Sequence, residues 1–186
     1  EKGKDLGIYP PTGKISKSVY KGKEDKAMVR LYMNGDYVYN EVNNNQLDAL
    51  GEVLQIKLIE RLREEESGVY SPRTSMGYSK FPKNRYSFTV SFGCAPQNID
   101  KLVNATLDEI NKIKKSGAQK SDIEKFIAEE KRTTELQLKN NGFWAGYLNE
   151  KYQNNEDPRD ILRYVESLNK ISPEDLKAAA TKYLSG

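Results

Sequence analysis

Arg63 and Tyr70 are the residues whose types and placement could do chemistry in this 186-residue chain. Arg63 lies in the charged run RLREEE at 61–66, which predicts the last turn of a helix, and Tyr70 follows seven positions later at the start of a predicted strand. Both side chains donate hydrogen bonds, so together they could hold the carbonyl groups of an extended peptide. Each also has a commoner structural role, because arginine complements the dipole of a helix end and tyrosine packs well at a strand end.

Several kinds of catalytic site are excluded by composition. The chain has no histidine, and a zinc site needs three or four suitably spaced ligands that the single cysteine, Cys94, cannot supply. No calcium-loop motif is present, and no base is available for a catalytic triad. We therefore expect no metal site, no catalytic residue and no hydrolytic activity in this chain alone. Cys94 is expected to be a buried structural thiol, with a reactive thiol as the alternative.

Charge and length set further bounds. The 30 basic and 27 acidic residues are interspersed and give a net charge of +3, which argues against a nucleic-acid surface. No apolar run approaches the roughly 20 residues that a membrane span needs. The length fits about one domain. We expect an arm or linker at residues 1–16 and a single domain at residues 17–186. Because the first residue is Glu1, we also expect a longer parent chain.

The elements that would position Arg63 and Tyr70 are a helix and a hairpin. Leucines at 47, 50, 54 and 58 predict an amphipathic helix, introduced by Asn43–Asn45. Strict alternation of polar and apolar residues over 85–92 predicts a strand with one buried face. Its partner strand contains Pro72, which predicts an interruption or a sheet edge. Two earlier strands are expected at 17–20 and 27–33.

Four helical segments are expected after the hairpin. The first runs from Asn98 to Gly117, and a capping box at Ser121–Glu124 opens a second that breaks near residues 140–142. Asp157-Pro158 and Ser172-Pro173 predict two further helix starts. The predicted order is β-β-α-β-β-α-α-α-α. Separate runs of strands and helices indicate an α+β fold: a largely antiparallel sheet with several helices packed on one face.

Other residues could take part in a site but have simpler explanations. Arg61 and Arg73 flank the pair and are expected to be solvated. Phe143 and Trp144, with Tyr147 and Leu148 on the same helical stripe, are expected to pack in the core or against another domain, or else to form part of a chamber wall. The polar face of the predicted sheet is expected to face solvent, with a chamber lining as the alternative.

The arrangement of Arg63, Tyr70, the segment SFTVSFGCAP at 87–96 and the later helices resembles a known family across residues 15 to 184. It is similar to the non-catalytic C-terminal repeat of the zinc peptidases related to pitrilysin, insulin-degrading enzyme and the mitochondrial processing peptidase, the inverzincins. That resemblance implies a half-domain of the processing-peptidase type. It also implies that Arg63 and Tyr70 bind substrate across a closed chamber.

The resemblance implies cofactors and partners that lie outside this chain. The family's catalytic repeat carries H-x-x-E-H, which binds zinc, so zinc is expected in the full-length enzyme and none in this fragment. Expected partners are a peptide substrate and the catalytic half, in the same chain or in a partner subunit. The bacterial relatives are often extracytoplasmic or periplasmic, but the sequence leaves the compartment open. Two alternatives remain: a catalytically dead relative acting as an assembly subunit, and a peptide-binding module.

Overall fold

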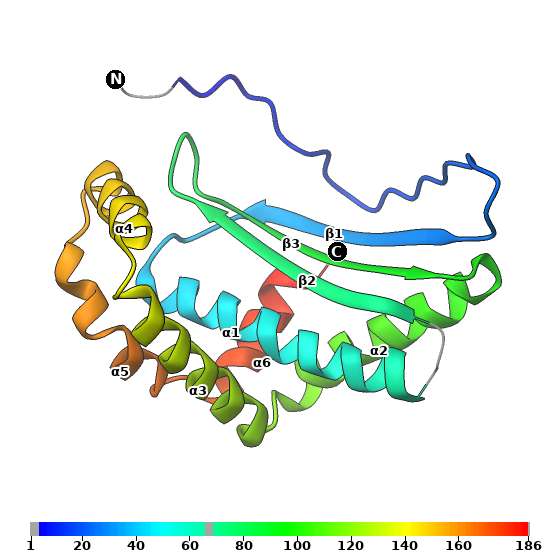
Figure 1. The fold of residues 1–186 in the computed structure, drawn as a ribbon. Coiled ribbons are helices and arrows are strands. Elements are labelled where there is room, and N and C mark those ends of the chain that lie inside the picture. The colour runs from blue at the N-terminus through cyan, green and yellow to red at the C-terminus, as the bar shows by residue number, and fades with distance from the viewer. Residues whose placement is uncertain (1–3, 66–68, 186) are drawn as a thin grey trace.

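The domain is built around a three-stranded antiparallel sheet with the strand order β1-β3-β2. The computed structural model describes residues 4–65 and 69–185, apart from the side chains of residues 63–65 and Tyr70. Strands β1 (Ala27–Asp36) and β2 (Val69–Ser79) pair on either side of β3 (Arg85–Cys94). Helices cover one face of the sheet, as expected for an α+β domain (Figure 1).

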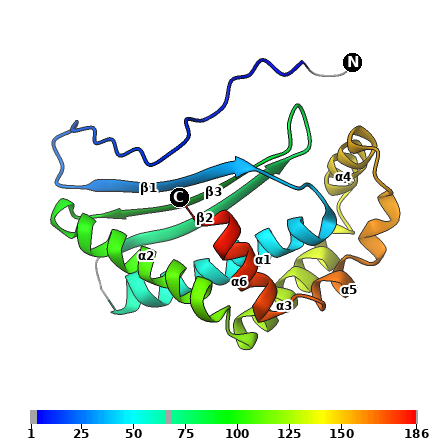
Figure 2. The same ribbon diagram turned by 180° about the vertical axis from the view of Figure 1, so that it is seen from behind.

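Helices occupy the segments between the first two strands and after the hairpin. Helix α1 (Glu41–Leu58) continues into the π-helical segment η1 (Ile59–Glu65). Viewed from behind, α1, α2 and α6 lie beneath the sheet, whereas α4 stands beside the end of the hairpin (Figure 2). The later elements are η2 (Pro96–Asn98), α2 (Ile99–Ser116), α3 (Lys120–Gln137), α4 (Asn141–Asn154), η3 (Pro158–Leu162), α5 (Tyr164–Leu168) and α6 (Pro173–Tyr183).

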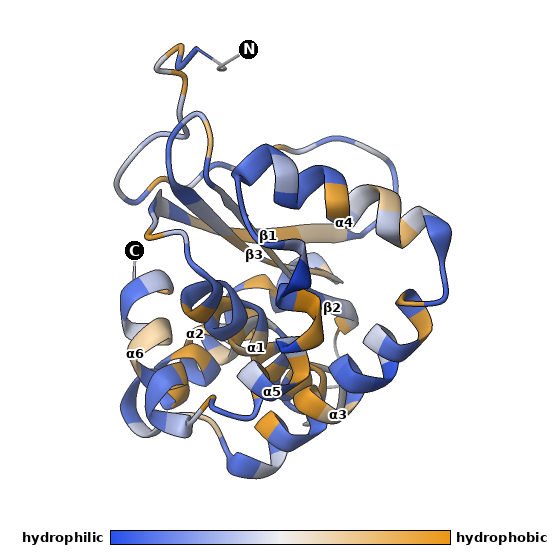
Figure 3. Ribbon diagram, turned by 90° about the vertical axis from the view of Figure 1, so that its left-hand side faces the viewer, coloured by the Kyte–Doolittle hydropathy of each residue, from blue (hydrophilic) through white to orange (hydrophobic). Residues whose placement is uncertain are grey.

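The hydrophobic core lies between the sheet and helices α1, α2 and α6. The predicted alternation in β3 is confirmed, because its even-numbered residues from Tyr86 to Cys94 are all buried. The leucine stripe of α1 is fully buried beneath them. Hydrophobic residues, drawn in orange, accordingly gather where α1, α2 and α6 meet, while the outer surfaces are largely blue (Figure 3). Cys94 is buried, as predicted, and burial raises the pKa of its thiol.

Of the two strands expected before the first helix, one does not form and the other is longer than expected. The segment 17–20 forms no strand and is exposed, within a stretch from residue 4 to 26 that has no helix or strand. A segment of four residues has little strand stability unless a neighbouring strand pairs with it. The strand predicted at 27–33 does form, and it continues through Gly35 to Asp36. The observed order therefore has one strand, not two, before α1.

The residues that cap the helices agree only in part with those predicted from the sequence. Helix α1 begins after Asn40, whose side chain accepts a hydrogen bond from the Asn43 backbone N–H at 2.8 Å, so Asn43–Asn45 lie inside the helix. The expected capping box at Ser121–Glu124 is wrong, since α3 begins at Lys120 and its cap, Gln119, makes no side-chain bond. The helix start predicted at Ser172-Pro173 is confirmed, and there Ser172 forms a capping box with Asp175. The helix end at Gly117 and the break before Asn141 are also confirmed.

Pro72 has the predicted effect on the hairpin. β2 is an edge strand, and its register against β3 shifts between Tyr70 and Arg73. Ser71 adopts a positive φ of 46° at this irregularity. Bulges of this kind bend a strand and re-aim the residues beside them. The strand that carries Tyr70 is thus bent just after that residue.

Replacing Gly51 with alanine is expected to lower the free energy of unfolding by about 1–3 kcal/mol, because the added methyl group overpacks the crossing of α1 and β2. A Cβ atom at position 51 would lie 1.9 Å from Sδ of Met76. The matched control is Gly146→Ala in α4, where a Cβ would meet no atom within 4 Å and should add about 0.5–1 kcal/mol of stability. Urea denaturation measures both. Equal stabilisation by the two substitutions would contradict close packing at Gly51.

Candidate substrate-binding site and a separate pocket

The backbone brings Arg63 and Tyr70 to the same end of the domain. Arg63 lies in η1, just beyond the C-terminal end of α1, and Tyr70 is the second residue of β2. Figure 1 shows the end of the α1–η1 helix and the start of β2 meeting at this end. The side chains of Arg63 and Tyr70 lie outside the described residues, so their contacts stay a prediction.

The helical segment that carries Arg63 is held in place from two sides. Leu58 at the end of α1 and Leu62 in η1 are both fully buried. Lys57 forms ion pairs with Glu60 at 3.0 Å and with Asp122 of α3 at 2.9 Å. A π-helical stretch is wider than an α-helix and often occurs at functional sites. The anchors fix its position against the core.

Asp122 is the buried centre of this anchor. Its side chain is 1% exposed and pairs with both Lys57 and Lys125, the latter at 3.2 Å. Burial disfavours its charge, but the two lysines outweigh this and hold the pKa of Asp122 below its usual value. Sequence reasoning assigned this residue to a capping box. The structure instead uses it to join α3 to the end of α1.

Tyr70 stands next to the open face of the sheet. It pairs with Gly93 of β3, in the row of odd-numbered residues that alternates with the buried row. On this face none of the described helices covers the strands, although the N-terminal arm runs above them and Tyr9 packs on Arg85 near the hairpin (Figure 1). The face is mostly polar, although Met28 and Tyr32 are 73% and 50% exposed there. Polar residues on this face include Arg30, Arg73, Ser75, Ser87, Thr89 and Ser91.

Arg61 and Arg73, the two arginines that flank the Arg63/Tyr70 pair, differ in their exposure to solvent. Arg73 is exposed on β2, as predicted. Arg61 is partly buried in η1 rather than fully solvated, and it takes part in interactions there. The expectation that Arg61 is solvated is therefore met only in part.

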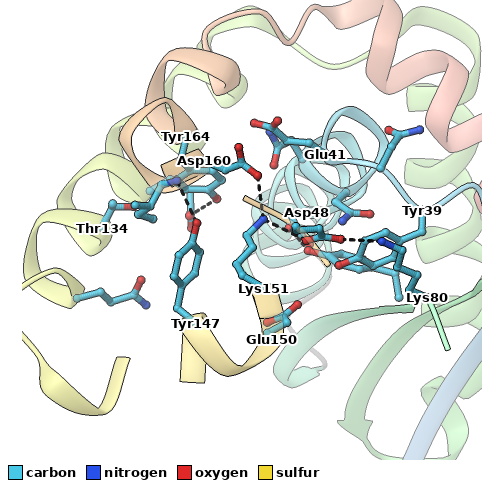
Figure 4. A pocket seen from close by; sticks show the side chains of 18 of the residues that line it. Tyr39, Glu41, Asp48, Lys80, Thr134, Tyr147, Glu150, Lys151, Asp160 and Tyr164 are labelled. Atoms are coloured by element: carbon cyan, nitrogen blue, oxygen red, sulfur yellow. Dashed lines mark hydrogen bonds and ion pairs between the residues drawn. The ribbon is translucent and has the colours of Figure 1, made fainter. Parts of the chain in front are cut away.

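A pocket of about 410 Å³ lies at the other end of the domain, and sequence reasoning did not find it. The start of α1, the end of β2 and the helices α3, α4, η3 and α5 supply its lining (Figure 4). Asp48 and Glu130 face it from α1 and α3, far apart in the sequence. No spacing motif links such residues, because only the packing of α3 and α5 against α1 brings them together.

Of the alternatives for the aromatic stripe on α4, packing in the core of this domain is wrong. No described residue of α4 is buried, so Phe143 and Trp144 do not belong to the core of this domain. Phe143 stacks on Tyr147 with ring centroids 5.6 Å apart, and both line the pocket. The indole N–H of Trp144 donates to the Leu138 carbonyl at 2.9 Å. Packing of this helix against another domain remains a prediction.

The described part of the chain also bears on metal binding and on membrane spanning. Residues 4–65 and 69–185 contain no group of three or more His, Cys, Asp or Glu side chains that could hold a metal ion. Within the same ranges, none of the helices is both long and apolar enough to cross a membrane.

Comparison with known families decides the relationship. Residues 2–129, more than half of the chain, match the family described as the peptidase M16 inactive domain. The chain belongs to this family. The resemblance to the inverzincin peptidases noted from Arg63, Tyr70 and their surroundings is therefore confirmed, as is the α+β half-domain fold.

Curated relatives of this M16 domain are named as zinc proteases. A zinc protease PQQL-like protein of Arabidopsis thaliana is 30% identical over 151 residues, covering 73% of this chain and 16% of the relative. A probable zinc protease PqqL of Haemophilus influenzae is 25% identical over 166 residues, covering 87% of this chain and 17% of the relative. The chain thus spans less than a fifth of the length of these two proteins.

Solved structures share the fold. The periplasmic protease PqqL from Escherichia coli superposes with a TM-score of 0.73 at 22% identity, covering 87% of this chain and 18% of that one. A peptidase M16 inactive domain from Pseudomonas fluorescens gives a TM-score of 0.72 at 14% identity, covering 86% of this chain and 38% of that one. At these identities the likeness concerns the fold.

Proposed function

We propose that this M16 inactive domain is the C-terminal substrate-binding and chamber-forming part of a zinc-dependent peptidase that degrades peptides. The observation that carries the proposal is the family match, together with relatives named as zinc proteases. The chain itself lacks histidine, and we expect no catalytic residue in it. An H-x-x-E-H half, in the same chain or in a partner subunit, would hold zinc, and the bound metal would supply Lewis-acid catalysis of peptide hydrolysis.

Arg63 and Tyr70 would hold the peptide from the wall opposite the zinc site. Their backbone positions support this role, since both lie at one end of the domain and Tyr70 adjoins the uncovered sheet face. Guanidinium and phenol groups donate to peptide carbonyl oxygens, which every substrate offers regardless of sequence. The polar open face would then form part of the chamber wall.

A substrate can be a protein as well as a short peptide in this structural class. A mutant of the ferredoxin protease FusC, solved in complex with Arabidopsis ferredoxin, superposes with a TM-score of 0.70 at 18% identity over 85% of this chain and 17% of that one. A periplasmic setting, as named for the Escherichia coli PqqL, is the compartment that we propose for the parent protein. The alternative function is a catalytically dead assembly subunit or peptide-binding module.

The full-length protein tests this function. We expect it to cleave unfolded peptides and to lose that activity when a chelator removes zinc, with recovery when zinc is restored. Its sequence is expected to contain H-x-x-E-H, or a co-encoded partner should carry it. A zinc-loaded full-length protein that cleaves no peptide, alone or with such a partner, would favour the assembly-subunit alternative.

A further inference from the structure

The pocket between α1, α3 and α4 carries an excess of negative charge. Its lining holds six carboxylate side chains and two ammonium groups (Figure 4). The volume of about 410 Å³ falls in the range of about 300–1,000 Å³ usual for small-ligand sites. The carboxylates are Glu41, Asp48, Glu130, Glu150, Glu156 and Asp160, and the ammonium groups are Lys80 and Lys151.

Both lysines already form ion pairs with carboxylates of the pocket, Glu156 and Asp160. Lys151 Nζ lies 3.2 Å from Glu156 and 3.3 Å from Asp160. Lys80 Nζ donates to the Asn154 carbonyl at 2.7 Å and lies 3.4 Å from Glu156. The two ammonium groups therefore neutralise Glu156 and Asp160. Among the described lining residues, no cation remains for the carboxylates of α1 and α3 on the opposite side of the pocket.

Asp48 and Glu130 on that opposite side receive only neutral donors. Asp48 accepts from the Tyr78 hydroxyl at 2.9 Å, and Glu130 accepts from the Tyr164 hydroxyl at 2.8 Å. In the described part of the chain neither carboxylate forms an ion pair. A neutral hydroxyl satisfies a lone pair but does not offset the cost of holding charge in a partly enclosed site.

The environment of Asp48 shows this cost. Burial, and then the charges of Glu130 and Glu52, raise the pKa of Asp48 to about 6, although the bond from Tyr78 lowers it. The other groups that sense its charge are Tyr37, beyond β1, and Tyr164 of α5, whose hydroxyl pKa values are raised. No ammonium or guanidinium group contributes at Asp48 among the causes of this shift.

The walls of the pocket are suited to a cation. Tyr39, Tyr78, Phe143, Tyr147 and Tyr164 line it, and the faces of aromatic rings attract positive charge. The pocket's own lysines already use such faces. Lys80 Nζ lies 5.7 Å from the centre of the Tyr39 ring, and Lys151 Nζ lies 5.6 Å from that of Tyr147.

We propose that the Asp48–Glu130 side of this pocket binds a protonated amine or guanidinium group carried by a peptide, either a Lys or Arg side chain or a free amino terminus. An organic cation is favoured over a metal ion, because the described residues form no cluster of three metal ligands. The peptide as carrier rests on the proposed function, whereas the cation preference rests on the pocket alone. Asp48 in the pocket precedes Arg63 by 15 residues along the continuous helix α1–η1. At 1.5 Å per residue, the two positions are about 20 Å apart.

Titration of the 186-residue chain with small probes tests the proposal. The cationic probes are Nα-acetyl-lysine N-methylamide, its arginine counterpart, and alanine N-methylamide with a free amino group. These distinguish the two side chains from an amino terminus. Nζ-acetylated Nα-acetyl-lysine N-methylamide is the neutral control. We expect at least one cationic probe to bind by calorimetry and to shift the NMR signals of pocket residues, and the neutral probe to do neither.

Variants locate the binding and keep the test decisive. Asp48→Asn and Glu130→Gln both retain an oxygen that accepts from the neighbouring tyrosine, and each should raise the Kd about tenfold through loss of a charged hydrogen bond. The control is Asp108→Asn, which removes one exposed carboxylate of α2 outside the pocket and should leave the Kd unchanged. Circular dichroism shows whether each variant folds. If one of the two pocket variants misfolds, the Kd of the other still tests the proposal.

The pH dependence provides a second readout. Binding should weaken as the pH falls through about 6 and Asp48 becomes protonated, and a bound cation should lower the pKa of Asp48 measured by carbon NMR. The proposal is overturned if no cationic probe binds, if the neutral probe binds equally well, or if the pocket variants bind like the parent chain. Because no cleavage is measured, these outcomes are independent of whether the full-length protein is a peptidase.

Discussion

Replacing Arg63 with alanine and Tyr70 with phenylalanine in the full-length protein is expected to lower peptide turnover about 100-fold, because a scissile bond that is misplaced by about 1 Å can lose a factor of this size. The effect is one of positioning. Neither residue is a zinc ligand, so zinc content should equal that of the parent. Rates of peptide cleavage at saturating and limiting substrate, with metal analysis on the same samples, measure both quantities.

The control for this variant removes the same chemical groups elsewhere. Arg132 on α3 and Tyr152 on α4 are exposed, and Arg132→Ala with Tyr152→Phe should leave turnover unchanged. Thermal unfolding separates lost activity from lost stability. Turnover at the parental rate in the Arg63/Tyr70 variant would show that these residues do not hold the substrate, and the domain would then be only a wall.

The isolated 186-residue chain is expected to bind no stoichiometric zinc and to cleave no peptide. Three or four ligands are needed to hold zinc, and the chain has no histidine and one buried cysteine. The hydrolysis expected of the parent enzyme uses a metal-bound water, and the described residues of this chain form no metal-ligand cluster. Metal analysis after dialysis against micromolar zinc and a fluorogenic peptide assay are the measurements.

The full-length protein serves as the positive control under the same conditions. An equivalent of tightly held zinc in the isolated chain, or cleavage that a chelator abolishes, would overturn the non-catalytic assignment of this domain. Cleavage that a chelator does not affect would point to a contaminating peptidase, which a second chromatographic step removes.

Much of the fold could be predicted because local rules and burial agree. The alternation in β3 fixes which face is buried, and the leucines of α1 fix the side of the helix that faces the sheet. Ser172 followed by Pro173 predicts a helix start that the structure has, with the Ser172 hydroxyl accepting from the Asp175 backbone N–H at 3.1 Å. At such sites a few neighbouring residues contain all the information.

Prediction failed where distant contacts override local preference. Ser121–Glu124 has the spacing of a capping box, yet Asp122 is turned inward to pair with Lys57 of another helix. The segment at 17–20 contains Val19 and Tyr20, which favour strands, but none of the described strands pairs with it. Phe143 and Trp144 have core-like chemistry, yet α4 lies beside the domain and leaves them half-exposed. The π-helical segment also has no local signal in its sequence.

The Arg63/Tyr70 site and the acidic pocket also differ in how far the sequence alone could predict them. Arg63 and Tyr70 could be proposed from the sequence because their spacing, between a helix end and a strand start, resembles that of a known peptidase family. Asp48, Glu130 and Tyr164 meet only after α3 and α5 fold against α1, so no pattern predicts the pocket. Its chemistry is visible only once the partners of each lysine are known.

The most direct measurement is photo-cross-linking from position 70 in the full-length protein. A photoreactive phenylalanine replaces Tyr70, zinc is removed with a chelator so that the peptide stays intact, and a labelled peptide substrate is added. Leu107, which is 43% exposed on α2 and outside the pocket, gives the control position. We predict a peptide adduct at position 70 that excess unlabelled substrate prevents, and none at position 107. Absence of an adduct at position 70, in a protein that cleaves the same peptide once zinc is restored, would contradict a substrate-binding role for this domain.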